Sequence, residues 1–94
     1  MQKEAALEAL RTIDVKVYAS QHQDLSPEQL ARLRAACSTL IASVSDNPTA
    51  ERKAATLVEL VLAILEKPVL AASAYELILE QGVCLSLFIQ QAPE

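Results

Sequence analysis

Few residues of this chain have the type and spacing that chemistry at a protein site requires. His22 is the single histidine, and it lies in a polar stretch between Gln21 and Asp24. A metal site would need further histidines, cysteines or clustered carboxylates near it, and a phosphotransfer histidine would lie in the middle of a helix. We therefore interpret His22 as an exposed polar residue and predict no metal site and no cofactor.

Pairs of glutamates are the next candidates, because Glu76 and Glu80 are one helical turn apart, as are Glu4 and Glu8. A di-metal bundle would combine such glutamates with a Glu-x-x-His motif, which the sequence lacks. No serine lies in a nucleophile elbow, and the single glycine, Gly82, excludes a glycine-rich phosphate loop. We expect a protein that is not an enzyme and has no small-molecule substrate.

Asp14 is the one carboxylate that interrupts an apolar stripe, since on a helical wheel it lies between Leu10 and Tyr18. The favoured interpretation places it at the edge of a bundle, solvated or paired with Arg11 one turn earlier. The alternative is a buried carboxylate that sets the register of a partner. An enzyme would have to use Asp14, because the sequence offers no other candidate.

The two cysteines, Cys37 and Cys84, both lie in apolar helical stripes. The first four residues have mixed charge and no apolar segment that would indicate a secretory signal. Two free, buried thiols in a reducing compartment are therefore expected in preference to a disulfide or a reactive pair. This pattern predicts a cytoplasmic protein.

Charge argues against nucleic acid, because 12 acidic residues outnumber 8 basic ones and no Lys or Arg follows Lys67. Binding to phosphates requires a concentrated basic face. The longest uncharged stretch, Gln81–Pro93, is shorter than the roughly 20 apolar residues of a membrane span. The sequence therefore predicts neither a nucleic-acid nor a membrane partner. A transcription-associated regulator is an alternative, and direct contact with nucleic acid would depend on Arg32, Arg34 or Arg52.

The composition predicts an all-α fold, since 52% of the residues are apolar and glycine occurs once. Ninety-four residues suffice for one domain, 1–94. Capping signals at Ser26-Pro27 and Asn47-Pro48 separate helices at about 2–20, 27–44 and 48–66. We predict a small antiparallel four-helix bundle, or three long helices and a short one.

The fourth helix leaves two questions open. It begins at Pro68, or at Ser73, where Glu76 completes a capping-box pattern. Gly82 either ends it or allows close approach of a neighbouring backbone, and Val83–Ile89 would form a lone strand if the helix ended there. We favour one continuous helix, whose inner stripe is formed by six residues: Leu77, Ile78, Cys84, Leu85, Phe88 and Ile89.

The second half of the chain has more apolar surface than one bundle can bury. Helix 48–66 has an apolar arc wider than the single stripe of a surface helix, so we expect it to be central or covered from a second side. The last helix has an additional row of apolar residues that would be exposed in a monomer. The residues predicted to bind protein are Leu62, Tyr75, Leu79, Val83 and Leu87.

These residues predict a cytoplasmic protein–protein interaction module, such as an adaptor, a chaperone or an accessory subunit of a larger assembly. A symmetric homodimer would use one patch on both subunits, and a groove for an amphipathic helix of another protein is the second option. In the opposing interpretation both rows of the last helix are internal, and the chain is a compact helical domain of no inferable activity.

Overall fold

The computed structural model describes residues 1–66 and 71–92, and the side chains of 71–73 are not part of the description. The described chain forms four helices: α1 (Lys3–Ser20), α2 (Pro27–Val44), α3 (Pro48–Glu66) and α4 (Ala71–Gln91). The predicted all-α four-helix bundle is thus confirmed, with four long helices. The alternative start of the last helix at Pro68 lies outside the described residues.

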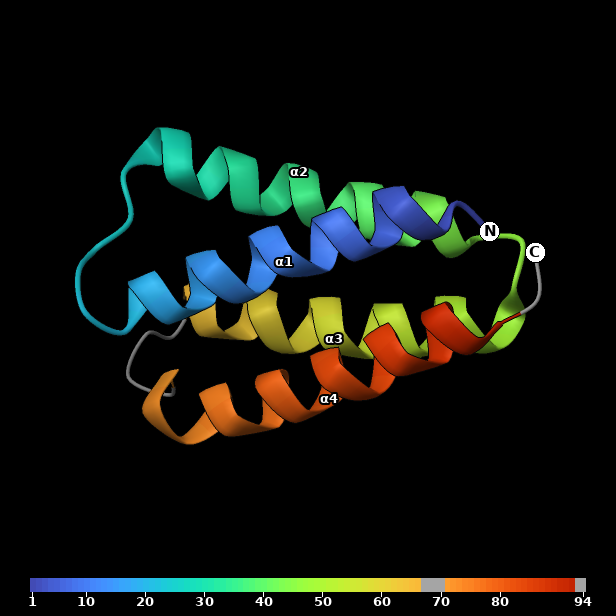
Figure 1. Cartoon of the computed structure of the whole chain (residues 1–94). Helices are drawn as coiled ribbons and strands as arrows, with labels where there is room; N and C mark the ends of the chain where they lie inside the picture. Colours follow the sequence, from blue (N-terminus) through green and yellow to red (C-terminus); the bar gives the residue numbers. More distant parts are fainter. Residues whose placement is uncertain (67–70, 93–94) are drawn as a thin grey trace.

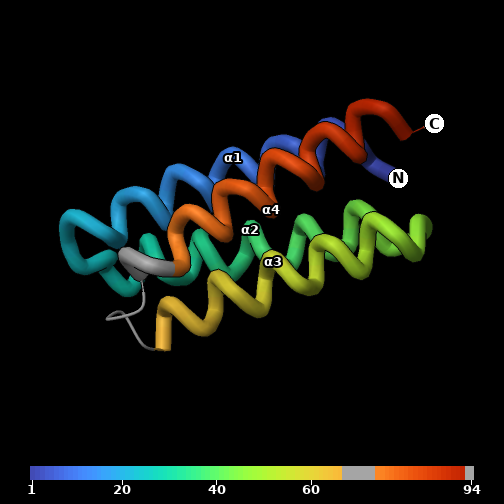
Figure 2. The backbone as a smooth tube through the Cα atoms, turned by 90° about the horizontal axis from the view of Figure 1, so that it is seen from below, coloured from blue at the N-terminus to red at the C-terminus, as the bar shows by residue number. Residues whose placement is uncertain are grey.

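Successive helices run in opposite directions, so the bundle has a simple up-and-down topology (Figure 1). α1 packs against α2 and α4, and α3 packs against the same two helices. The tube in Figure 2 shows α1 and α4 side by side, with the beginning of α1 and the end of α4 at the same end of the bundle. The α1–α4 pair, whose members are far apart in the sequence, therefore forms one face of the molecule.

The start of α2 is fixed by the capping box that the sequence predicts. The Gln29 backbone N–H donates to the Ser26 hydroxyl oxygen at 3.2 Å, and the Ser26 N–H donates to the Gln29 side-chain oxygen at 2.9 Å. Pro27 occupies the first helical turn, where its missing N–H would have no helical partner. The local sequence therefore specifies this helix end without help from the rest of the fold.

The start of α3 uses the predicted asparagine cap. The Ala50 N–H donates to the Asn47 side-chain oxygen at 3.1 Å, and Pro48 is the first helical residue. At the same end of the bundle, the Gln2 backbone N–H donates to the Ser43 carbonyl oxygen at 2.8 Å, which joins the beginning of α1 to the last turn of α2.

The fourth helix begins at Ala71 and continues through Gly82. Ser73 therefore lies inside the first helical turn, and the capping interpretation that started the helix there is wrong. A Cβ built on Gly82 would have no neighbour within 4 Å, so this glycine does not serve the close approach of another backbone. The prediction of one continuous helix is confirmed.

The core lies along the axis of the bundle and receives apolar side chains from all four helices. The predicted inner stripe of α4 is partly wrong, because Leu77 and Cys84 are exposed while Ile78, Leu85 and Ile89 are buried. α4 is apolar on several sides, so its sequence pattern alone does not select the face that packs. The largest fully buried side chains are Ile13, Leu33, Leu40, Leu57, Leu85, Ile89, Val17, Val44 and Val61.

α3 is not the central helix, contrary to one prediction from its wide apolar arc. It occupies one corner of the bundle between α2 and α4. Its buried face includes Leu57 and Val61, whereas Leu62 and Ala63 on its outer side are exposed. The excess apolar surface of α3 therefore remains uncovered within a single chain.

Candidate functional site

The outer side of α4 has three large apolar side chains in contact with solvent. Leu79, Val83 and Leu87 are 41%, 52% and 50% exposed, respectively. Their spacing of four residues places them in one row along the helix, and we call these three residues the α4 row. The interpretation in which both rows of the last helix are internal is therefore wrong for the single chain.

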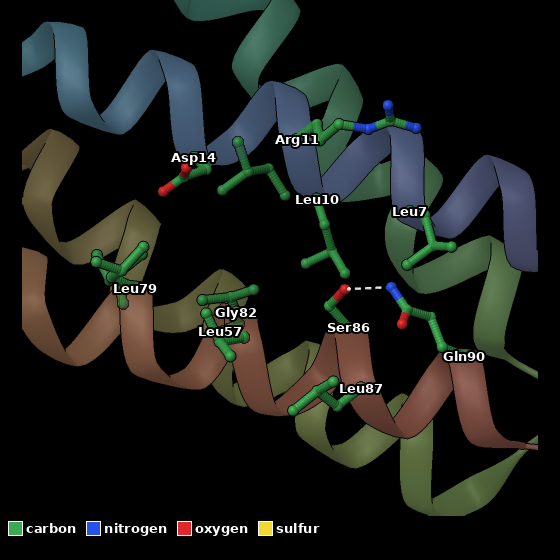
Figure 3. A pocket seen from close by; sticks show the side chains of 13 residues that line it. Leu7, Leu10, Arg11, Asp14, Leu57, Leu79, Gly82, Ser86, Leu87 and Gln90 are labelled. Atoms are coloured by element: carbon green, nitrogen blue, oxygen red, sulfur yellow. Dashed lines mark hydrogen bonds between the residues drawn. The ribbon is translucent and has the colours of Figure 1, made fainter.

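A groove of about 500 Å³ runs beside the α4 row, between α1 and α4. Leu7 and Leu10 point from α1 toward α4, and Ser86 and Gln90 point from α4 toward α1 (Figure 3). The α4 row itself lines this groove, together with Leu57 of α3. The apolar surface is thus a row with an adjoining concave strip.

Four polar side chains also line the groove: Arg11, Asp14, Ser86 and Gln90. The Gln90 amide nitrogen donates to the Ser86 hydroxyl at 3.4 Å, which is a long hydrogen bond on the surface. Arg11 is the one basic residue that lines the groove. Its guanidinium pairs with Glu8 at 3.3 Å, and both side chains are largely exposed. Such a pair contributes little to stability and can exchange partners readily.

Asp14 lies on the α1 side of the groove with its side chain half-buried. The predicted ion pair with Arg11 is not formed, because Arg11 pairs with Glu8. The placement at the edge of the bundle is confirmed, and Asp14 is not enclosed as the buried-carboxylate alternative required.

Tyr75 belongs to an aromatic cluster and does not line the groove. Its ring lies 6.0 Å from that of Tyr18, which in turn lies 4.8 Å from the exposed His22. Burial, and then the negative charges of Asp14 and Tyr18, raise the pKa of the Tyr75 hydroxyl above its ordinary value. The side chain is half-buried against the core, so it offers less surface to a partner than the row does.

Leu62, the remaining residue of the predicted binding set, lies on a different side of the bundle. It lines a second groove between α2 and α3, together with Arg34, Ile41 and Leu65. The structure therefore brings Leu79, Val83 and Leu87 together and separates Leu62 from them. The position of Leu62 depends on which side of α3 packs against α2 and which against α4. The helical pattern of α3 alone does not specify this.

The two cysteines differ in their surroundings, although both are free. Cys37 is buried as predicted, and burial raises the pKa of its thiol to about 11. Cys84 is exposed on α4, so the prediction of a buried thiol at this position is wrong. The Cys37 thiol is protonated at neutral pH and is poorly suited to act as a nucleophile.

Sequence reasoning missed the contribution of α1 to the site. Leu7 and Arg11 line the groove, and Val15 and Tyr18 are exposed nearby on the same helix at 63% and 53%. The sequence signal for the apolar part of this contribution is the width of the α1 stripe. Leu7 and Tyr18 are apolar positions beside the residues that the bundle buries.

Within residues 1–66 and 71–92, no group of three or more His, Cys, Asp or Glu side chains could hold a metal ion. The helices of this same part of the chain are too short or too polar to cross a membrane. What the described site offers chemically is a place to bury apolar surface.

Comparison of the chain with protein-family models, with curated proteins and with solved structures gives no match. The bundle architecture and the exposed α4 row are therefore the observations from which a function has to be inferred.

Proposed function

We propose that this chain is a protein–protein interaction module that binds through the α4 row and the adjoining groove. It would act as an adaptor, a chaperone or an accessory subunit of a larger assembly, without catalysis, cofactor or metal. The observation that supports the proposal is the exposure of Leu79, Val83 and Leu87 in one row. Fully burying an aliphatic side chain of this size contributes roughly 1.5–3 kcal/mol, and about half of that remains to be gained at each of these half-exposed positions, so the row favours association over solvent contact.

The polar surroundings of the row also support a protein partner. The groove is lined mainly by aliphatic side chains with a few polar groups at its edges, as expected of a binding patch with an apolar centre and a polar rim. The absence of Lys and Arg after Lys67 makes the α4 face unsuitable for phosphates. A partner with an apolar stripe of its own fits this face better than a nucleic acid does.

We propose the cytoplasm as the compartment. The support is that Cys84 is an exposed, unpaired thiol, a state that persists in reducing compartments and is readily oxidised elsewhere.

The test is site-specific photo-crosslinking in the cell that produces the protein. A photoreactive amino acid replaces Leu87 in the α4 row, and in a control chain it replaces Ala35, which is exposed on α2. We expect discrete protein adducts from position 87 and none from position 35.

The matched variant changes Leu79 and Leu87 to Glu in one chain that has the photoreactive residue at Val83. We expect loss of the adducts with little change in melting temperature, because both leucines are exposed. The proposal is wrong if position 87 gives no adduct, if positions 35 and 87 give the same adducts, or if the double variant loses its fold instead of its adducts.

A further inference from the structure

We infer that the groove between α1 and α4 binds a basic amphipathic helix of another protein, with a large apolar side chain of that helix in the open space at Gly82. Lysines or arginines of the bound helix then lie beside Asp14, Glu76 and Glu80. This inference rests on the proposed function and names the chemistry of the partner. Three features of the surface support it: the shape of the groove, the space at Gly82 and the negative charge at one end.

The groove has the length and the walls that suit a helix. Its lining runs from Leu79 to Gln90 of α4, which at a rise of about 1.5 Å per residue is roughly 17 Å, or about three helical turns. Both walls are helices whose backbone N–H and C=O groups are paired within α1 and α4, so an extended peptide would find no backbone partners there. A helix satisfies its own backbone groups and lays an apolar stripe into such a groove.

An open space at Gly82 can receive a side chain of the bound helix. Leu10 of α1 and Leu57 of α3 line the groove, although both are almost fully buried. Gly82 lines it too, and a Cβ added there would meet no atom within 4 Å. A large apolar residue of the partner can therefore reach core side chains between α1 and α4. A central side chain of this kind, shielded from water, dominates the affinity of many protein interfaces.

One end of the groove is acidic. Glu76 and Glu80 each lie two helical turns before a residue of the α4 row, so both are on the side of α4 that carries the row. Asp14 lies across the groove from Leu79 (Figure 3), and its negative charge reaches Tyr75, the neighbour of Glu76. Within residues 1–66 and 71–92, none of these three carboxylates forms an ion pair.

Unpaired carboxylates beside an apolar groove favour a partner with positive charge. Arg11, the basic residue among those that line the groove, pairs with Glu8 at 3.3 Å and points away from α4 (Figure 3). A second copy of the chain would bring the same carboxylates to the contact, and an anionic membrane surface would be repelled by them. A helix with lysine or arginine next to its apolar stripe gains both apolar burial and charge pairing.

Synthetic helical peptides are the probe for this surface. The first, the lysine peptide, has about 18 residues, which is long enough to form a helix, with a leucine stripe on one side and lysines on the other. The second replaces every lysine by glutamate. The third keeps the composition of the first and distributes the leucines without a stripe. In fluorescence anisotropy titrations with the purified chain, the lysine peptide should bind about tenfold more tightly than either of the others.

Charge variants locate the bound peptide. Glu76→Gln together with Glu80→Gln should weaken binding of the lysine peptide about fivefold, because two surface ion pairs are lost. The matched control is Glu51→Gln together with Glu59→Gln, which removes the same charge from exposed positions of α3 and should leave the Kd unchanged. An equal effect of the two double variants would mean that the peptide responds only to net charge, and this result overturns the inference.

A variant that fills the open space tests the apolar anchor. Gly82→Leu should weaken binding of the lysine peptide roughly tenfold. Its melting temperature should not fall, because the space is open and leucine favours a helix more than glycine does. Ala63→Leu at an exposed position of α3 is the control and should leave the affinity unchanged. An unchanged affinity of Gly82→Leu contradicts the placement of a partner side chain at Gly82.

The natural adduct separates this inference from the proposed function. Mass spectrometry of the adduct formed by photoreactive residue 87 identifies the segment of the partner that lies on the groove. A segment with helical apolar spacing and adjacent lysine or arginine supports the inference. A segment without this pattern, a second copy of this chain, or a lysine peptide that does not bind overturns it, and the proposed function stays intact as long as position 87 forms a protein adduct. The absence of any adduct contradicts the proposed function itself.

Discussion

At the scale of single residues, the two thiols should differ sharply in reactivity. Burial raises the pKa of Cys37 to about 11, whereas Cys84 is exposed. Only the thiolate reacts with a disulfide reagent, and at pH 9 a thiol with that pKa is about 1% ionised. We expect one thiol per folded chain to react with a chromogenic disulfide reagent at pH 7–9, and two in denaturant.

Cys84→Ser is the matched variant for this measurement. The folded variant should give almost no reaction up to pH 9 and one thiol after unfolding. Cys37 is part of the buried core. Its rapid reaction in the folded variant would contradict this burial, because it would mean that the core around Cys37 opens frequently to solvent.

At the scale of secondary structure elements, Gly82 is the residue whose replacement should stabilise the chain. It lies in the interior of α4, and an added Cβ meets no atom within 4 Å. Glycine in a helix costs about 0.5–1 kcal/mol relative to alanine, because the unfolded chain loses more conformational freedom. Gly82→Ala should therefore raise the free energy of unfolding by that amount in urea titration.

The reciprocal control for this change is Ala63→Gly, at an exposed position of α3. It should lower the free energy of unfolding by a similar amount. Destabilisation by Gly82→Ala would show that the groove beside α4 closes on this position in solution.

Elements with local signals could be predicted from the sequence. The Ser26-Gln29 capping box and the Asn47 cap set the beginnings of α2 and α3 through contacts within four residues. The face of α4 could not be predicted as well, because apolar residues surround most of that helix. For this reason the helical pattern places Leu77 and Cys84 in the core, whereas the structure exposes both.

The arrangement of the helices explains which part of the candidate site could be predicted. The exposure of Leu79, Val83 and Leu87 follows from a four-residue spacing that diverges from the stripe of Ile78 and Leu85. The position of Leu62 depends on which side of α3 faces α2. The contribution of α1 residues such as Leu7 and Arg11 to the groove depends on the packing of the first helix against the last. Both are properties of three-dimensional packing that no single helical pattern contains.

At the scale of the whole molecule, the proposed role of the α4 row makes thermal stability depend on whether a partner protein is bound. A ligand that binds the folded chain and not the unfolded one raises the melting temperature by mass action, and under the proposed function that ligand is the partner protein. The small size of the chain, 94 residues, makes its melting temperature sensitive, since about 1 kcal/mol shifts that of a domain of this size by roughly 4–8 °C.

We therefore expect Val83→Glu to melt at the temperature of the isolated wild type, because residue 83 is half-exposed and its replacement leaves the core unchanged. The partner protein recovered by crosslinking at position 87 should raise the melting temperature of the wild type and leave that of Val83→Glu unchanged. Circular dichroism of each chain alone and with this partner gives both comparisons. A Val83→Glu variant that melts far below the isolated wild type would return Val83 to the fold of the single chain, and an equal rise for both chains would remove it from the interface.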